Sequence, residues 1–249
     1  QQKQRADRDH SPWRVVDVIA FQSSGGASHK LLADGSVLIS GARPDKDTYT
    51  VLAKTNLSRI TAFKLEALTD PSLPGQGPGR HHPERPNFVL HEFDVKAHAE
   101  EAPAKTANAV QLHSPWADYS QPQYPVKGAI DGDPKTGWAI HAQFHKPHVA
   151  TFRTQKPTGF EGGTLLRIAM PQNHGGTRTL GRFRISVCES EPPASESPPE
   201  QLIPDAIAEI IQTPAASRDE ELIDELREFY LARQPDLMKL QNQLDSLKQ

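Results

Sequence analysis

Short runs in which apolar and polar residues alternate fill the chain over 13–188, and turn-forming residues separate them. In residues 60–68, Phe63 and Leu65 fall on one face and Lys64 on the other, as in a strand with one buried side. Nine such runs are predicted as strands, at residues 13–21, 36–40, 48–56, 60–68, 87–95, 108–114, 148–154, 164–170 and 181–187. Because no helical pattern separates them, the sequence predicts an all-β fold, a two-sheet β-sandwich or jelly roll.

The character of the sequence changes after Cys188. Pro, Ser and Glu dominate the next residues and are typical of a linker. Helical patterns follow at 203–212, 217–233 and 235–249, and Ser217 and Glu220 have the spacing of a capping box. The predicted organisation is a polar tail (1–12), a β-sandwich (13–188), a linker (189–201) and a short α-helical C-terminal connector (202–249). The connector is expected to pack on a neighbouring domain, with a self-dimerising zipper as the alternative.

Composition and charge narrow the class of protein. The net charge is -3, from 28 basic and 31 acidic side chains that are well mixed along the 249 residues, so nucleic acid is not expected as a partner. One cysteine, Cys188, excludes a disulfide within the chain and a Cys-rich zinc site. No apolar run approaches a membrane span, so membrane insertion is not expected. The first ten residues lack a secretory core, and both ends are expected to continue into a longer chain.

Residues 128–140, GAIDGDPKTGWAI, combine aspartates, glycines, a proline and a tryptophan. Counting from Asp131, the sixth residue is Thr136 and the twelfth is Ala142, which excludes an EF-hand. Two interpretations stay open. Asp131, Asp133 and the Thr136 hydroxyl could hold a cation together with backbone carbonyls, or the aspartates could bond to their own backbone and fix a turn. Trp138, which follows the turn, is predicted to be a core residue.

The segment AIDGDPKTGW resembles the A-x-D-G-x-x-x-T-x-W signature of discoidin, or coagulation factor 5/8 type C (F5/8 type C), domains. These are galactose-binding-like jelly rolls that include many carbohydrate-binding modules. Taken with residues 32–51, 60–80, 87–95, 124–140 and 180–187, and with a helical tail at 203–230, the chain is similar to the module found in large planctomycete surface proteins. Those proteins carry a planctomycete-type cytochrome c and associated domains of unknown function.

The resemblance implies a non-catalytic β-sandwich with a structural calcium near this turn. Carried onto this chain, the calcium ligands are Asp131, Asp133 and Thr136, with Glu92 or Asp94 as further candidates. Where the family commonly has Arg or Lys before the Trp, this chain has glycine, so the family's particular ligands do not transfer. The resemblance also implies an exported protein, periplasmic or on the cell surface.

Sugar recognition needs an aromatic face that stacks on a pyranose ring, flanked by planar hydrogen-bonding groups. A loop after residue 113 offers aromatic side chains, and two later loops offer His and Arg. The predicted ligand-binding residues are Trp116, Tyr119, Tyr124, His145, His148, His174 and Arg178. His141, His145 and His148 would cluster only on a helix, and their segment is predicted as loop and strand, so no transition-metal site is expected.

No hydrolase, metalloprotease, P-loop or dinucleotide motif is present, and the sequence predicts no enzyme. The functional hypothesis is a non-catalytic carbohydrate-binding module in a larger multidomain exported protein. It would bind a polysaccharide or oligosaccharide through loops at one end of the sandwich, beside the parent protein's neighbouring domains. The alternative is a structural or protein–protein docking module with no glycan ligand.

Overall fold

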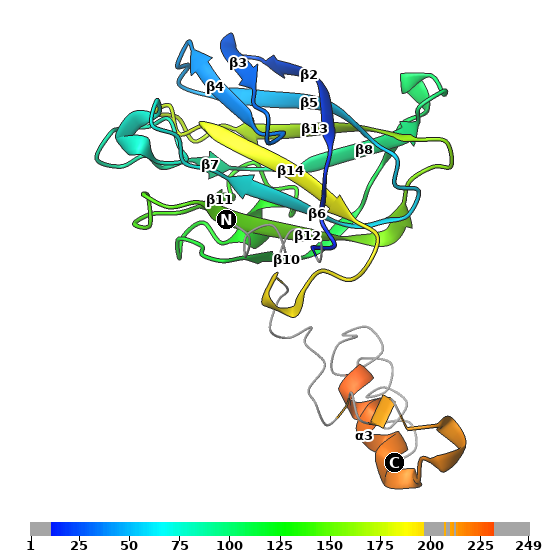
Figure 1. The fold of residues 1–249 in the computed structure, drawn as a ribbon. Helices are drawn as coiled ribbons and strands as arrows, with labels where there is room; N and C mark the ends of the chain where they lie inside the picture. The colour runs from blue at the N-terminus through cyan, green and yellow to red at the C-terminus, as the bar shows by residue number, and fades with distance from the viewer. Residues whose placement is uncertain (1–10, 197–206, 208–209, 212, 232–249) are drawn as a thin grey trace, which may run out of the picture. The chain divides into compact units, whose positions relative to one another are not determined.

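The chain forms two compact units, residues 1–199 and 200–249. The computed structural model describes residues 11–196, 207, 210–211 and 213–231. Every described strand lies in the first unit, and the second contains helix α3 (Glu220–Leu231) (Figure 1). No helix among the described residues is long and apolar enough to cross a membrane.

Two antiparallel sheets form the first unit. The seven-stranded sheet has the order β10 (Leu112–Ala117), β12 (His148–Thr158), β6 (Ile60–Ala67), β14 (Arg182–Cys188), β4 (Val37–Gly41), β3 (Ala27–Leu31), with β1 (Arg14–Val15) paired to β14. The five-stranded sheet has the order β2 (Asp17–Ser23), β5 (Asp47–Thr55), β13 (Thr164–Gln172), β8 (Asp94–Ala99), β9 (Asn108–Ala109). A further pair joins β7 (Val89–Leu90) to β11 (Trp138–Ala139).

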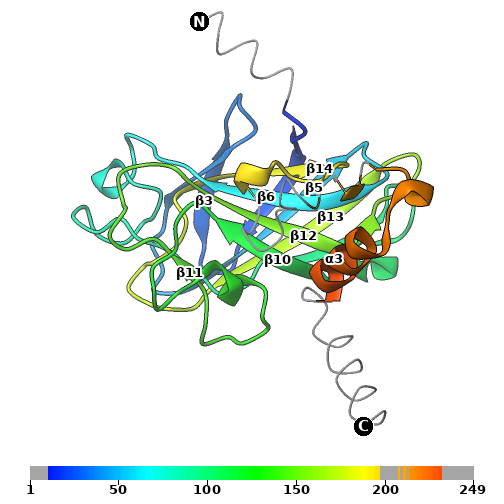
Figure 2. The same ribbon diagram turned by 90° about the horizontal axis from the view of Figure 1, so that it is seen from below.

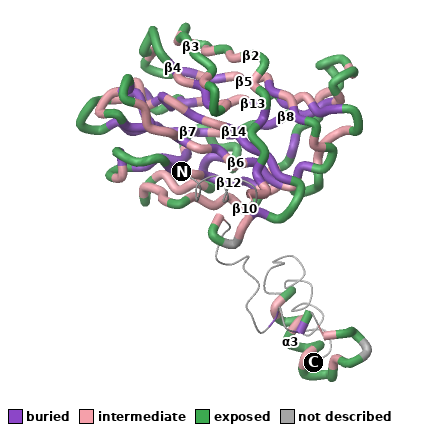
Figure 3. Tube along the Cα trace, viewed as in Figure 1, coloured by how far each residue is buried: buried purple, intermediate pink, exposed green. Residues whose placement is uncertain are grey.

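The inner faces of the two sheets bury the core, as the layered ribbons in Figure 2 and the buried central strands in Figure 3 show. Strand β5 alternates buried and half-buried residues along its whole length, as expected for a strand with one face against a core. Trp138 is fully buried, and its ring lies edge-on to Phe88 at 5.1 Å between centroids. Its indole N–H donates to the Tyr119 carbonyl at 3.0 Å, so the prediction that Trp138 is a core residue is confirmed.

Successive strands cross between the sheets, from β5 to β6, and from β12 to β13 and back to β14. Such connections are typical of jelly rolls. The predicted all-β sandwich followed by a short C-terminal helix is confirmed. Each of the nine predicted runs contains a strand, and β3 and β11 were not predicted.

Residues after Cys188 return to the outer face of the seven-stranded sheet. The Thr151 hydroxyl donates to the Glu196 carbonyl at 2.7 Å. The Glu196 carboxylate accepts the Trp13 indole N–H at 2.6 Å and lies 3.6 Å from Lys64 Nζ. The part of the predicted linker that is described therefore contacts the sandwich, while the domain boundaries stay a prediction.

Helix α3 falls within the second helical pattern, but its cap differs from the predicted one. The Asp219 carboxylate accepts the backbone N–H of Leu222 at 3.0 Å, which makes Asp219 the N-cap. Ser217 ends a 3-10 turn instead (Ala215–Ser217), so the predicted capping box is wrong. The third helical pattern and most of the first lie outside the described residues.

Candidate functional site

Four chain segments that are far apart in the sequence meet in a small pocket at the end of the sandwich where β7 and β11 lie (Figure 1). The cavity has a volume of about 170 Å³. Its lining residues are His81, Arg85, Asn87, Val89, Gln121, Tyr124, His141, His174 and Arg178. We call this cavity the loop pocket. Three of the predicted ligand-binding residues, Tyr124, His174 and Arg178, line it.

The loop between β13 and β14 holds Arg178 in place through two glycines. Gly175 and Gly176 have φ angles of +87° and +65°, which favour glycine. A Cβ atom on Gly176 would lie 2.4 Å from Arg178 Nη1, so the guanidinium occupies space that a side chain at position 176 would take. Arg178 Nη1 donates to the Gly175 carbonyl at 3.1 Å, and His81 Nδ1 donates to the Gly176 carbonyl. The Asp45 carboxylate accepts the Gly176 N–H at 2.6 Å and anchors the loop.

Tyr124 and Asn87 reach the same pocket from two other loops. The backbone N–H of Tyr124 donates to the Gln121 carbonyl at 2.9 Å, and its carbonyl accepts the Ala139 N–H at 3.2 Å. Asn87 is buried, and its side-chain oxygen accepts the Ile140 N–H at 3.1 Å. The Tyr124 ring lies edge-on to His174 at 5.5 Å between centroids. The pocket thus combines one aromatic ring with planar polar groups.

The charges of the loop pocket have one sign. Two arginines and three histidines line it, and no carboxylate is among its lining residues. Burial lowers the pKa of His174, and the Arg178 charge lowers it further. Burial also lowers the pKa of His81, opposed by its bond to the Gly176 carbonyl and assisted by Arg178. Imidazoles held neutral near pH 7 can both donate to and accept from hydroxyl groups.

Trp116 lies in strand β10 and not in a loop, so that part of the prediction is wrong. Its direct cross-strand partner is Thr151, which alternates with the core residues Ala150 and Phe152. Partners directly opposite share one face of a sheet, so Trp116 is half-buried on the outer face of the seven-stranded sheet. A bulge before it, where Ser114 has a φ angle of +49°, shifts the register of the strand.

The other three predicted ligand-binding residues also lie outside the loop pocket. The Tyr119 hydroxyl donates to the His141 carbonyl at 2.7 Å, and the exposed His145 lies with Nδ1 3.0 Å from the Gly75 carbonyl. His148 is fully buried. Its Nε2 is 2.6 Å from the Gln143 carbonyl and its Nδ1 is 3.1 Å from an Asp118 oxygen, so both ring nitrogens are engaged inside the protein.

Several residues of the loop pocket were absent from the predicted set. Arg85 and Asn87 come from a Pro/Gly-rich loop whose polar residues carry no periodic pattern. The available signal was the density of His and Arg between prolines in RHHPERPN. His141 was considered as a metal candidate, and no sequence rule shows that these loops converge.

The turn at 128–140 gathers oxygen atoms that are potential calcium ligands. Four oxygen atoms surround the Thr136 hydroxyl oxygen: the two Asp131 carboxylate oxygens at 2.8 and 3.0 Å, and the carbonyls of Asp133 and Gly128 at 3.0 and 3.2 Å. One hydroxyl hydrogen satisfies only one of them. An all-oxygen set with a carboxylate is the chemistry that calcium prefers, so these residues fit the ion.

The aspartates also form the turn. The Asp131 carboxylate accepts the Asp133 N–H, and the Asp133 carboxylate accepts the Lys135 N–H, each at 2.9 Å. Asp133 therefore contributes its carbonyl, and not its carboxylate, to the oxygen cluster. Among the described residues, no three side chains of His, Cys, Asp or Glu converge as a metal site. The cation interpretation stays a prediction that rests on one carboxylate, one hydroxyl and backbone oxygens.

Glu92 lies beside this turn and accepts the Gly132 N–H at 2.6 Å. Burial raises the pKa of Glu92 to about 7; the Gly132 N–H opposes the rise, and the carboxylates of Asp94, Asp131 and Asp133 add to it. The turn is therefore a region of concentrated negative charge. A bound cation would relieve that repulsion.

No family model and no curated protein matches the chain. One similar solved structure is that of the CBM32-1, CBM32-2 and M60 catalytic domains of Clostridium perfringens ZmpB, with 10% sequence identity and a TM-score of 0.36. The match covers 96% of this chain and 21% of that chain, so this chain spans about a fifth of the length of the protein it matches. A likeness this weak assigns neither a family nor a ligand.

Proposed function

We propose that this chain is a non-catalytic carbohydrate-binding module of a larger exported protein, and that it binds its glycan in the loop pocket. The observation that carries the proposal is the convergence of Tyr124 from one loop and His174 and Arg178 from another, beside Asn87 and Gln121. An aromatic ring flanked by planar polar groups is the arrangement that recognises a pyranose. The cavity of about 170 Å³ is small for a ligand pocket and suits a single sugar residue.

The charge of the loop pocket specifies the sugar further. A pocket lined by two arginines, with no carboxylate among its lining residues, favours a sugar that carries a carboxylate or sulfate group. The same lack of a lining carboxylate supports a binding role, since glycoside hydrolysis generally uses a pair of carboxyl groups. Calcium held by the 128–140 turn would be a structural ion in this module.

A glycan array followed by affinity electrophoresis tests the proposal, with neutral, uronate-containing and sulfated glycans side by side. At least one acidic glycan should retard the protein. Arg178→Gln and Tyr124→Ala should each weaken that binding about tenfold or more, because each removes a direct contact. If no glycan of the panel binds the protein, the proposal is contradicted and the docking alternative is favoured.

Trp116→Ala provides a matched control for Tyr124→Ala. It removes an aromatic side chain of the same module, but one that lies on the outer face of the seven-stranded sheet. The variant should bind the glycan as the unchanged protein does. Loss of binding in Trp116→Ala together with full binding in Tyr124→Ala would move the site from the loop pocket to strand β10.

A further inference from the structure

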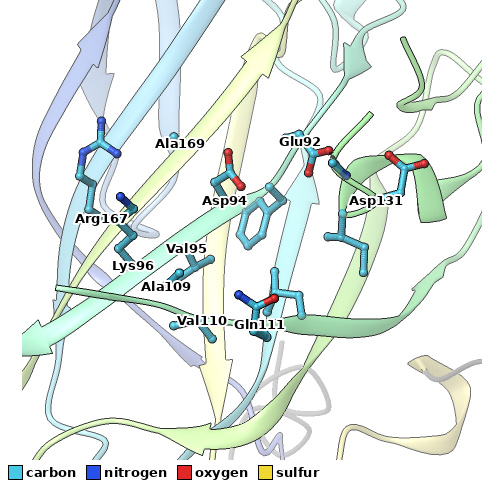
Figure 4. A pocket seen from close by; sticks show the side chains of 14 residues that line it. Glu92, Asp94, Val95, Lys96, Ala109, Val110, Gln111, Asp131, Arg167 and Ala169 are labelled. Atoms are coloured by element: carbon cyan, nitrogen blue, oxygen red, sulfur yellow. Dashed lines mark hydrogen bonds between the residues drawn. The ribbon is translucent and has the colours of Figure 1, made fainter. Parts of the chain in front are cut away.

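A second cavity lies on the five-stranded sheet and shares no lining residue with the loop pocket. Its volume is about 530 Å³. Strands β8, β9 and β13 and the start of the 128–140 turn line it, and Figure 4 shows their side chains. Val95 and Ile168 point into the core, so their neighbours Asp94, Lys96 and Arg167 belong to the outer face of the sheet. We call this cavity the sheet pocket.

Small side chains leave room for the sheet pocket. Ala109 and Ala169 flank the charged residues on neighbouring strands, and Val110 and Ile130 add apolar surface. Longer side chains at the two alanines would fill the space above the sheet. The pocket is therefore a hollow with an apolar floor and charged groups around it (Figure 4).

Two cations stand side by side in the sheet pocket. Lys96 and Arg167 are direct cross-strand partners on β8 and β13, and both are exposed. Like charges directly opposite each other destabilise a sheet. Neither forms an ion pair with any residue in the described part of the chain, although Asp94 lies two residues from Lys96 on the same face. The pair therefore keeps its capacity to bind an external anion.

Several other strand cations of this protein are paired, although Lys30 on β3 and Lys156 on β12 form no ion pair among the described residues. Lys54 lies 3.2 Å from Glu100, and Arg184 lies 2.7 Å from Glu66. The Arg153 guanidinium lies 2.5 Å from Glu191. Lys96 and Arg167 differ from these because they lie directly opposite each other and neither has a carboxylate partner among the described residues. The sheet pocket is therefore a place where a ligand can supply the counter-charge.

The opposite end of the sheet pocket is acidic. Figure 4 shows Lys96 and Arg167 at one end, Asp94 between, and Glu92 and Asp131 at the other. Carboxylates accept hydrogen bonds, and sugar hydroxyl groups donate them. A ligand that satisfies both ends carries an anionic group at one end and hydroxyl groups at the other.

We propose that the sheet pocket is a second glycan-binding site, in which Lys96 and Arg167 bind a sulfate or carboxylate group and Asp94 and Glu92 accept hydrogen bonds from sugar hydroxyls. The site goes beyond the proposed function because it needs no residue of the loop pocket. Two such sites on one module would bind an acidic polysaccharide bivalently, which raises the overall affinity without new contacts at either site.

Affinity electrophoresis with dextran sulfate, dextran and polygalacturonate tests the sheet pocket. Dextran sulfate and dextran share a backbone, so their difference isolates the sulfate group, and polygalacturonate tests a carboxylate. The double variant Lys96→Gln/Arg167→Gln should bind at least one of the two acidic polymers about tenfold more weakly, because it loses two charge-assisted contacts. Its melting temperature should stay equal or rise, because the like-charge repulsion is removed.

Lys54→Gln is the matched control. Lys54 is a cation on the outer face of the same sheet, paired with Glu100 and absent from the lining of the sheet pocket. The single variant Lys96→Gln is compared with it, because each of the two substitutions removes one positive charge. Equal weakening by the two would reduce the effect to net charge and overturn the sheet pocket.

The experiments can reject the proposed site in the loop pocket and the proposed site in the sheet pocket independently. If Lys96→Gln/Arg167→Gln binds both acidic polymers as the unchanged protein does while Arg178→Gln does not, the second site is wrong and the proposed function stands. If Arg178→Gln binds normally while the double variant does not, the sheet pocket stands and the loop pocket is wrong. Equal binding of dextran and dextran sulfate, without binding of polygalacturonate, would contradict the anionic specificity of the sheet pocket.

Discussion

The position of Arg178 in the loop pocket depends on a residue with no side chain. Gly176→Ala would place a Cβ atom 2.4 Å from Arg178 Nη1, at a φ angle of +65° that costs an alanine about 1–2 kcal/mol. We expect the variant to lose about tenfold in affinity for the glycan identified on the array, and to unfold at a lower temperature. Isothermal titration calorimetry and thermal unfolding measure the two effects.

Gly162→Ala separates backbone strain from the steric clash with Arg178. Gly162 has a φ angle of +86°, but a Cβ atom there would meet nothing within 4 Å. This control should lose a similar amount of stability through backbone strain and keep its affinity. If Gly176→Ala binds as tightly as Gly162→Ala, Arg178 does not need the space that Gly176 leaves.

Asp118 links the stability of the protein to pH at the residue scale. Burial acts to raise its pKa, but hydrogen bonds from His148 and from the Val149 N–H outweigh it and hold the pKa below the ordinary 3.8. Because the folded-state pKa is the lower one, the stabilisation is fully present above pH 4 or so and is lost as the pH falls through the folded value.

Asp118→Asn should therefore lower the free energy of unfolding by about 1–2 kcal/mol at pH 7, since the buried His148 loses a charged partner that is itself partly exposed. The gap between variant and unchanged protein should shrink as the pH falls below about 4. Urea unfolding at a series of pH values measures it. Asp17→Asn, at an exposed position of β2, should leave stability unchanged, and a gap that stays constant down to pH 2 would contradict the linkage.

At the scale of elements, the residues after β14 act as a strap over the seven-stranded sheet. Glu196 ties this strap to Trp13 and Lys64, and the Lys64 ammonium lies 4.7 Å from the centre of the Trp13 ring. Glu196→Ala should lower the free energy of unfolding by about 1.5–3 kcal/mol, because it removes charge-assisted bonds in a partly buried place. Limited proteolysis should also cut after Cys188 more rapidly.

Glu189→Ala is the control for the strap, because Glu189 is an exposed carboxylate of the same segment. It should change neither stability nor the rate of cleavage. Identical behaviour of the two variants would mean that the strap is not held by Glu196.

The elements that the sequence predicted are those that bury one face. Strand β5 alternates because its inner side chains reach the core, and a two-residue period reveals it. Strand β3 was missed because it is an edge strand whose residues are mostly exposed, so only backbone hydrogen bonds define it. The single run predicted at 87–95 contains β7 and the start of β8, which belong to different sheets. An apolar pattern alone cannot show where a chain changes sheet.

At the scale of the whole molecule, the limit of sequence reasoning is the packing of loops. Tyr124, His174 and Arg178 were predicted from residue type, and the structure brings them together. Trp116 and His148 were predicted on the same grounds and lie elsewhere, because strand register and burial placed them. Residue chemistry thus predicted which groups could bind a sugar, but only the three-dimensional arrangement determines which of them share a pocket.

The 128–140 turn joins the core to both the surface and the sheet pocket, so an ion bound there would affect the whole fold. Trp138 at its end is fully buried, while Asp131 lines the sheet pocket. An ion that binds only the folded state stabilises it by mass action, by about 2.7 kcal/mol at a concentration one hundred times its Kd. For a domain of this size that corresponds to a rise in Tm of about 5–11 °C.

We expect calcium to raise the Tm of EDTA-treated protein by this amount, and magnesium to do so much less, because the cluster is built from several protein oxygens in an irregular loop. Asp131→Asn should abolish the calcium response, since Asp131 supplies the cluster's one carboxylate. Asp133→Asn should keep it, because only the Asp133 carbonyl faces the cluster. If calcium does not change the Tm, or if both variants lose the response equally, the aspartates have the single role of fixing the turn.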